Sequence, residues 1–326
     1  MRAKIMGERE MGHQMRLYKQ VERLLKKGKL DEIVELILSE EYLHEMDKKQ
    51  RQTVAQLIAS NKKHFRPLVT RLIEEERISV DADFGDLFSP MSLLRACIFM
   101  GEEDFAIELI ERGARLDGVQ EGGMTLVHDA AQQGQTRVLE AMYRYGAELD
   151  AQTADDHEGN ASAIQMACMD GMEDVVSCLL EFGCELEQEN HRGESLLQIA
   201  VKNRHEGLVR LLLERGADVN VSKITGRTPL HEAVNRRQPA LTEMLLKGGA
   251  DPDLVDEYGW SALHLASAKG DAESVVLLCD AGADRDLRTE DVCRLRGVEV
   301  ESGATCLDVA EAYNQMKVKD VLMSFE

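Results

Sequence analysis

The sequence predicts an all-α solenoid of about nine helix pairs joined by β-turn fingers, and three observations predict it. Similar segments recur every 33 residues in the second half of the chain. Aromatic residues make up only 4% of the 326 residues, so the core must be built from aliphatic and small side chains, which favour helices. A period of about 20 to 50 residues is typical of repeat architectures, in which each unit buries its apolar face against its neighbours.

The period is clearest in three segments that begin with glycine. GESLLQIAV, GRTPLHEAV and GWSALHLAS start at Gly193, Gly226 and Gly259, at intervals of 33 residues. One earlier interval is 37 residues, which places a loop four residues longer at 151–159. Glycines that end the second helix of each unit follow the same spacing: Gly113, Gly146, Gly183, Gly216, Gly249 and Gly282.

Each unit contains the residues expected of a short helix pair. Thr228 can cap a helix N-terminus through its side-chain oxygen, and Pro229 suits the first helical turn. Ala233 lies at the centre of that helix, where a small side chain permits close packing. The second helix, such as 208–215, has apolar residues at i, i+3 and i+4 and is followed by glycine.

These motifs resemble the ankyrin-repeat family. The T-P-L-H of Thr228–His231 and the LVRLLLERGADVN of Leu208–Asn220 are similar to its repeat motif, and the similarity is clear over roughly 120–284. The resemblance implies a helix–helix–finger unit whose concave face binds a partner protein. That face is made of the finger tips and the exposed side of each first helix.

The repeat pattern weakens toward both ends, and this predicts the organisation of the chain. We expect degenerate helical repeats or a cap at 1–88, core repeats at 89–286, a long finger insertion at 287–302 and a capping repeat at 303–326. The segment 39–51 is the predicted flexible junction. We also expect the loop at 151–159 and the insertion to project from the finger side, where insertions in repeat arrays commonly mark the binding face.

Positions that face a partner in this family can be transferred by register. On a chain of net charge −21 they combine aromatic and basic residues, the types enriched at binding hot spots. Trp260 lies in the slot directly after the finger glycine, which holds Glu194 or Arg227 in other units. Because this slot tolerates charge, we expect a surface position; the alternative is packing against the neighbouring finger. The predicted partner-binding residues are His191, Arg192, Lys202, Ile224, Arg227, Arg236, Tyr258, Trp260 and Lys269.

No motif predicts catalysis, a cofactor or a metal, so we predict no catalytic, cofactor-binding or metal residues. G-x-x-x-x-G-K-[ST], H-E-x-x-H and G-x-S-x-G do not occur. The seven cysteines are scattered without C-x-x-C spacing, which disfavours a disulfide framework or a zinc site. His128, His231 and His264 share one register and would be separated by about 10 Å for each repeat between them; the family resemblance implies that they bond to backbone and brace adjacent fingers.

Charge predicts the kind of partner. Residues 1–77 carry 17 basic and 13 acidic residues, net +4, and the rest of the chain carries 22 and 47, net −25. A protein that binds duplex DNA normally has the opposite balance. The sequence has no membrane-spanning apolar run and no secretory h-region at its start. We therefore expect a protein partner, no nucleic acid, no membrane and a cytoplasmic monomer, delivered into a host cell if it is a bacterial effector.

These observations favour a protein-interaction module without chemistry of its own, acting as adaptor or inhibitor. Three alternatives stay open: an effector or immunity-type inhibitor of a specific enzyme, an acidic mimic that competes for nucleic-acid-binding proteins, and an enzyme with its site in 1–90 or 287–302. Asn220 has the context in which some ankyrin repeats are hydroxylated, and we favour a turn-forming role for it.

Overall fold

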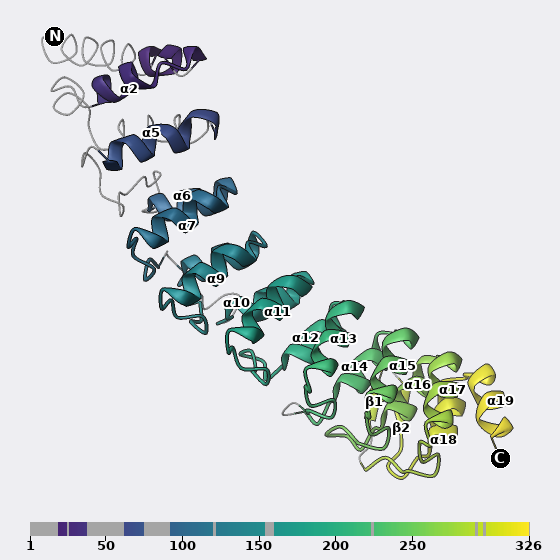
Figure 1. Cartoon of the computed structure of the whole chain (residues 1–326). Coiled ribbons are helices and arrows are strands. Elements are labelled where there is room, and N and C mark those ends of the chain that lie inside the picture. The colour runs from purple at the N-terminus through teal and green to yellow at the C-terminus, as the bar shows by residue number, and fades with distance from the viewer. Residues whose placement is uncertain are drawn as a thin grey trace, which may run out of the picture. The chain divides into compact units, whose positions relative to one another are not determined.

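A computed structural model gives the fold, and the helices and strands are labelled in Figure 1. The chain divides into two compact units, 1–155 and 156–326, which are described separately. The structure describes residues 19–24, 26–37, 62–74, 92–119, 122–153, 160–222, 225–290, 293–295 and 298–325.

The first unit is built from helices that pack in pairs. Helix α6 contacts α7 and α8, α9 contacts α7 and α8, and α2 contacts α5. These helices are α2 (Leu30–Ile37), α5 (Lys62–Glu74), α6 (Leu93–Met100), α7 (Glu103–Glu111), α8 (Leu126–Gln132) and α9 (Thr136–Arg144).

The second unit contains two rows of helices. The even-numbered first helices contact one another in the order α10, α12, α14, α16 and α18, and the odd-numbered second helices form the neighbouring row. The helices are α10 (Ala163–Asp170), α11 (Glu173–Glu181), α12 (Leu196–Lys202), α13 (Glu206–Glu214), α14 (Pro229–Asn235), α15 (Pro239–Lys247), α16 (Ala262–Lys269), α17 (Ala272–Asp280), α18 (Cys306–Ala312) and α19 (Met316–Ser324).

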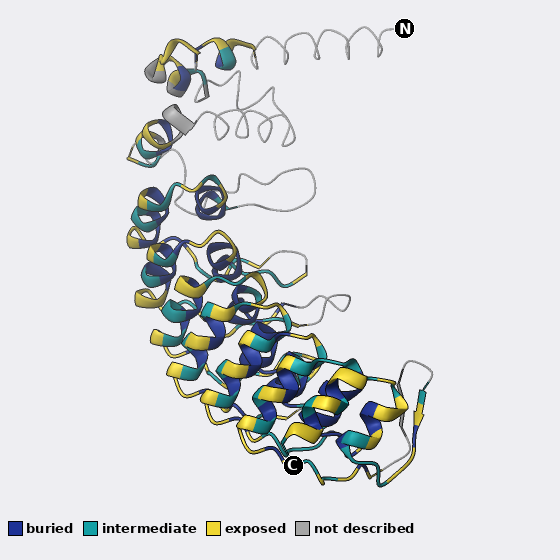
Figure 2. Cartoon of the chain, turned by 90° about the vertical axis from the view of Figure 1, so that its right-hand side faces the viewer, coloured by how far each residue is buried: buried dark blue, intermediate teal, exposed yellow. Residues whose placement is uncertain are grey.

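The first helices pack closely because the residues at their centres have small side chains. In Figure 2 their inward sides are buried, while exposed residues lie on the outer faces of the second helices and on the loops. The predicted alanine positions confirm the pattern, since all five are buried: Ala130, Ala167, Ala200, Ala233 and Ala266. An alanine costs little side-chain entropy in a helix and lets neighbouring first helices approach.

Reciprocal caps start the first helices, as the Ser and Thr positions predict. In a capping box the cap side chain accepts from the backbone N–H three residues later, whose own side chain bonds back to the cap N–H. Six of the described first helices have this box, with caps at Thr125, Ser162, Ser195, Thr228, Ser261 and Thr305. The residue that completes the box is His, Gln or Asp, so the motif tolerates several polar side chains.

The repeat solenoid that the sequence predicts is therefore present. From residue 92 onward the described residues contain seven helix pairs. Upstream, the structure describes only α2, α5 and a short helical stretch at 19–27 apart from residue 25, so much of the predicted segment 1–88 lies outside the described residues, as does the junction at 39–51. Of the loop at 151–159, residues 154–159 also lie outside them.

The insertion at 287–302 forms the one strand pair among the described residues. Strand β1 (Cys293–Leu295) pairs antiparallel with β2 (Val298–Val300), with Cys293 opposite Val300. Beneath the hairpin the finger closes normally: the N–H of Thr289 donates to the carbonyl of Ala304 at 3.0 Å. Relative to the 33-residue period the insertion adds eleven residues. They lengthen the finger without changing the hydrogen bond that closes its base, which Asp256 and Trp260 form in the preceding finger.

Candidate partner-binding face

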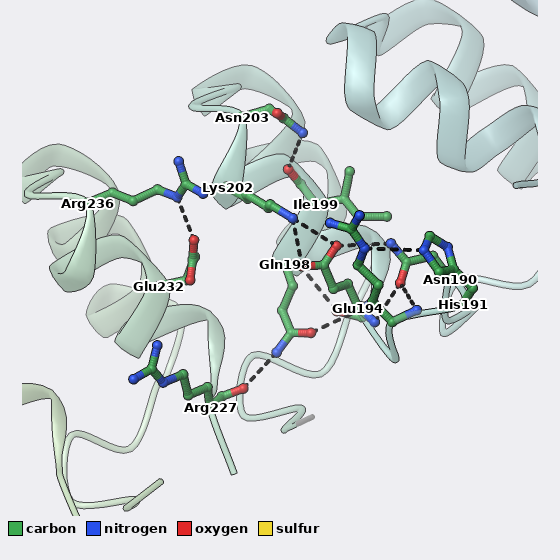
Figure 3. A network of polar contacts seen from close by, with 12 residues as sticks. Asn190, His191, Glu194, Gln198, Ile199, Lys202, Asn203, Arg227, Glu232 and Arg236 are labelled. Carbon is green, nitrogen blue, oxygen red and sulfur yellow. Dashed lines mark hydrogen bonds and ion pairs between the residues drawn. The ribbon is translucent and has the colours of Figure 1, made fainter. Parts of the chain in front are cut away.

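The finger at 189–195 is a rigid hydrogen-bonded loop (Figure 3). The side-chain oxygen of Asn190 accepts from the backbone N–H groups of Arg192 and Glu194 at 2.9 and 3.0 Å. The N–H of Asn190 donates to the carbonyl of Glu194, and that of Gly193 donates to the carbonyl of Asn190. Such a side-chain-closed turn needs little help from its surroundings. It holds His191 and Arg192 at the tip, where both are exposed.

Glu194, the residue after the finger glycine, is buried but fully paired. The Nζ atom of Lys202 lies 2.9 and 3.2 Å from its two carboxylate oxygens, and Asn190 donates its amide to the same carboxylate at 3.0 Å. Figure 3 shows these three side chains converging from the finger and from the end of α12. A buried carboxylate needs such partners, because desolvation of an unpaired charge is costly.

The finger at 255–261 has the same backbone. The carboxylate of Asp256 accepts from the N–H groups of Tyr258 and Trp260 at 3.0 and 3.1 Å, as Asn190 does in the earlier finger. Tyr258 lies at the tip with 42% of its surface exposed. The predicted exposure of the tip residues is thus observed in both fingers.

Trp260 corrects the sequence analysis, because its side chain is only 1% exposed. The expectation that its slot lies at the surface is wrong. The fingers that contain Gly226 and Gly259 are each covered by the next one: a Cβ atom on Gly226 would stand 3.0 Å from the Cα of Asp256, and one on Gly259 only 2.3 Å from the backbone nitrogen of Glu290. The slot beside Gly259 therefore lies under the following finger, and the indole of Trp260 is not accessible to a partner.

The indole of Trp260 is packed rather than hydrogen-bonded. Its ring lies 6.2 Å from that of His264, at an interplanar angle of 46°. Its Nε1 atom is buried and has no hydrogen-bond partner among the residues that the structure describes. A buried donor without a partner is destabilising, so the ring is held by apolar packing.

Several of the predicted basic partner-binding residues are paired with carboxylates within the chain. Besides Lys202, Arg227 pairs with the buried carboxylate of Asp256 at 3.4 Å, and Arg236 pairs with Glu232 within α14 and its cap. Counting charges along the sequence therefore overstates how positive this face is. Of the other predicted residues, Lys269 is half-exposed and Ile224 lies outside the described residues.

Two of the three register histidines, His231 and His264, brace adjacent repeats, as the family resemblance implies. The Nδ1 atom of His231 accepts from the N–H of Thr228, so its Nε2 carries the proton and donates to the carbonyl of Trp260 at 2.9 Å. His264 has the same contact to the carbonyl of Ala304, at 3.3 Å. Burial lowers the pKa of both imidazoles, which keeps them neutral. In an earlier unit, Gln198 occupies this position and donates to the carbonyl of Arg227 at 2.8 Å.

On α6, in the first unit, the bracing position holds an arginine, which sequence reasoning missed. Arg95 donates to the carbonyls of Gly118 and Met124 at 3.2 and 3.0 Å, as the histidines do later. Its Nε also contacts the carboxylate of Asp129 at 2.5 Å, and both side chains are buried. Burial raises the pKa of Asp129, and Arg95 opposes that rise. The signal available in the sequence was the position of Arg95 three residues after Ser92, the same distance that separates His231 from its cap Thr228.

Asn220 joins neighbouring fingers. Its side-chain oxygen accepts from the N–H of Asp251 at 2.8 Å, and its amide lies 3.5 Å from the carbonyl of Gly249. This contact between repeats supports the structural interpretation of Asn220. The cysteines Cys97, Cys168, Cys184 and Cys306 are buried, in keeping with a role in the core, whereas the side chain of Cys293 is not described.

In the part of the chain that the structure describes, no group of three or more His, Cys, Asp and Glu side chains has the arrangement of a metal site. No helix there combines the length and apolar character that crossing a membrane requires.

Comparison with known proteins agrees with this geometry. A family model described as ankyrin repeats (three copies) matches residues 127–223 and 220–291, which together span half of the chain. Among solved structures, the crystal structure of the ankyrin repeat domain of Bcl-3, described as a unique member of the IkappaB protein family, is 28% identical with a TM-score of 0.61. The match covers 71% of this chain and 97% of that one. A search of curated proteins gives no match.

Proposed function

This chain belongs to the ankyrin-repeat family, a scaffold for protein interaction, and from that premise we propose that it binds a partner protein through its finger face and acts by occupancy, as adaptor or inhibitor. The finger face comprises the finger tips at 191–192, 225 and 257–258 together with the exposed sides of α12, α14 and α16. The observation that carries the proposal is the exposure of His191, Arg192 and Tyr258 on hydrogen-bonded frames.

Rigid presentation supports binding because less freedom is lost on association. The backbone under each tip is closed by Asn190 or Asp256, so a partner would not have to order the loop. Tyr and Arg are enriched at binding hot spots, and Tyr258 and Arg192 offer one of each at the surface. The likeness to another ankyrin domain over 97% of that chain's length also supports a module of this kind.

The acidic-mimic alternative predicts a different salt dependence. The region beyond residue 77 carries a net charge of −25, which would attract basic nucleic-acid-binding proteins. Binding that rests on long-range charge collapses as ionic strength rises, since screening is strong beyond about 10 Å at 0.1 M salt. A contact centred on Tyr258 and Arg192 would lose far less affinity over the same range.

The test is quantitative capture of partners by the full chain. We expect Arg192→Ala with Tyr258→Ala to reduce capture of a specific partner at least about tenfold, because two tip contacts of hot-spot type are removed. The matched control is Tyr145→Ala with Arg210→Ala, which removes the same residue types from exposed positions at the end of α9 and on α13. Unchanged circular dichroism shows that both variants fold.

Two outcomes contradict the proposal. Equal capture by the wild type and the Arg192/Tyr258 variant would remove the finger face from the interaction. Equal loss in the control variant would point to general charge or stability effects. If a captured enzyme loses activity when the chain is added, the protein acts as its inhibitor; unchanged activity favours an adaptor.

A further inference from the structure

The turns between paired helices contain two arginines in an unusual backbone conformation. Arg204 and Arg237 have φ angles of 65° and 54°, in the left-handed region that favours glycine. At the same point of neighbouring pairs the chain uses Gly171 and Gly270, with φ of 77° and 68°. A side chain is disfavoured in this conformation, so two successive repeats contain arginine where glycine would fit without strain.

Each arginine reaches across to the next repeat. The Nη2 atom of Arg204 lies 3.5 Å from the carbonyl of Arg236, and Arg237 donates to the carbonyl of Lys269. With the Gln238 amide oriented to satisfy both of its atoms, its oxygen accepts from the Nε of Arg204 at 3.1 Å. These contacts hold the guanidinium groups at the C-terminal ends of first helices.

The two guanidinium groups lack a carboxylate partner among the described residues and retain most of their N–H donors. Among the described residues, every polar contact of Arg204 and Arg237 is to an uncharged oxygen, and neither has a carboxylate within ion-pair distance. Both residues are exposed. A guanidinium has five N–H donors, so several remain for a ligand. This distinguishes them from Lys202, Arg227 and Arg236, which are paired with carboxylates.

Basic side chains gather at these turns. The ends of three consecutive first helices, α12, α14 and α16, and the turns that follow them form a group that we call the turn ridge. Lys202 and Arg236 are paired with Glu194 and Glu232, so Arg204 and Arg237 provide its unpaired positive charge among the described residues, in a region beyond residue 77 whose net charge is −25. The turn ridge consists of Lys202, Arg204, Arg236, Arg237 and Lys269.

We propose that the turn ridge binds an acidic, extended segment of the partner protein, with Arg204 and Arg237 each contacting a carboxylate. The inference rests on the proposed function and names the chemistry of the partner. Guanidinium groups bind carboxylates in a two-point geometry, and anchored ones lose less freedom on binding.

Repeat spacing sets the spacing of the acidic residues. Packed helices of adjacent repeats lie about 8 to 10 Å apart. An extended polyproline II chain advances about 3.1 Å per residue with three residues per turn, so every third side chain lies on the same face, about 9 Å from the last. Carboxylates on every third residue of the segment therefore match successive arginines of the turn ridge.

The test measures binding of a fluorescent peptide to the full chain by anisotropy. The probe has Glu at every third position with Gly and Ser between, and its counterpart has Gln in place of Glu. The variant is Arg204→Gly with Arg237→Gly, in which glycine adopts the same backbone angles without strain, so folding is retained. We expect it to weaken binding of the Glu peptide about tenfold, since two exposed ion pairs are lost, and we expect the Gln peptide to bind poorly to every form.

Two matched controls isolate the cause. Asn314→Gly relieves the same conformation, φ 54°, without changing charge. Arg210→Gln with Lys247→Gln removes two positive charges from exposed positions on α13 and α15. Both controls should bind the Glu peptide as the wild type does.

Several results would overturn the proposal. One is equal binding of the Glu peptide by the wild type and the glycine variant, and another is an equal loss of binding in the Arg210/Lys247 control. The others are self-association that the glycine variant abolishes, and a single-stranded oligonucleotide that binds more tightly through the same arginines. If partner capture depends on Tyr258 but the glycine variant binds the Glu peptide as tightly as the wild type does, only the turn-ridge proposal is overturned. Peptide binding through Arg204 and Arg237, without any finger-face partner, overturns the proposed function alone.

Discussion

The fingers 189–195 and 255–261 have the same backbone but different contents. In each, a side-chain oxygen at the second position accepts from two backbone N–H groups, and a glycine with φ of 65° or 75° forms the turn. The slot after that glycine holds Glu194 in one finger and Trp260 in the other. Both side chains are buried, at 6% and 1% exposed.

A finger thus has two independent parts: the hydrogen-bonded backbone, which we call the frame, and the side chain in the slot after the glycine, which we call the filling. The frame is satisfied by its own polar atoms, so it tolerates a carboxylate or an indole equally. The residue after the glycine is buried in both fingers, so its own polar atoms must be satisfied separately. Glu194 has Lys202 and Asn190 as partners, whereas the Nε1 of Trp260 has none within the described ranges. A residue type that is normally exposed elsewhere is therefore no guide to exposure in this slot.

The largest expected effect is at Trp260. Trp260→Ala should lower the free energy of unfolding by about 3 to 5 kcal/mol, because it leaves a large cavity under the next finger. Trp260→Phe should cost less than about 1.5 kcal/mol, since it keeps much of the packing and removes an unpaired buried donor. Urea denaturation measures both changes.

Tyr258→Ala is the control for this prediction. The side chain is 42% exposed, so its removal should change stability by less than about 0.5 kcal/mol. Similar losses for Trp260→Ala and Tyr258→Ala would mean that the slot is open to solvent, and the comparison between frame and filling would fail.

An intermediate effect is expected in the other finger. Lys202→Ala leaves the buried Glu194 carboxylate without its cation and should cost about 2 kcal/mol, less than a fully buried pair because the Lys202 side chain is 29% exposed. Adding Glu194→Gln should recover part of that loss, since the unpaired charge is removed. A double-mutant cycle by urea denaturation measures the coupling, and strictly additive losses would argue against a functional ion pair.

The smallest effect concerns the bracing residue after each finger, His264 in one case and Gln198 in the other. Burial lowers the pKa of His264 below its ordinary value of 6.5. Its contribution to stability is fully present above pH 6.5 and is lost as pH falls toward the lowered folded-state value, because the unfolded chain binds the proton more readily. His264→Gln should therefore make the melting temperature less sensitive to acidification from pH 7.5 to 5.5.

Gln198→His provides the reverse experiment, since the introduced imidazole would occupy an equally buried position. Its melting temperature should fall more steeply with acidification than that of the wild type. If both variants keep the wild-type pH profile, the bracing histidines do not contribute to acid sensitivity.

Sequence reasoning located the finger tips but misjudged what lies between them. His191, Arg192 and Tyr258 are exposed where the register predicts, because a tip follows directly from the turn residues. Trp260 was misplaced because the tolerance of its slot for charge suggested solvent, whereas Glu194 is accommodated by partners within the chain. Arg204 and Arg237 were missed because their positions are normally considered as turn residues, and only the backbone angles show them to be exceptional.

The 33-residue period, the capping residues and the small helix centres determined the fold from sequence alone, since each acts within one repeat or between identical neighbours. Only the tertiary structure decided which side chains are buried and which charges are free. Arg227 pairs with Asp256, 29 residues away, and the cover over Trp260 comes from the finger that contains Glu290. Such contacts join different positions of successive repeats, and local sequence patterns contain no information about which atoms will meet across that boundary.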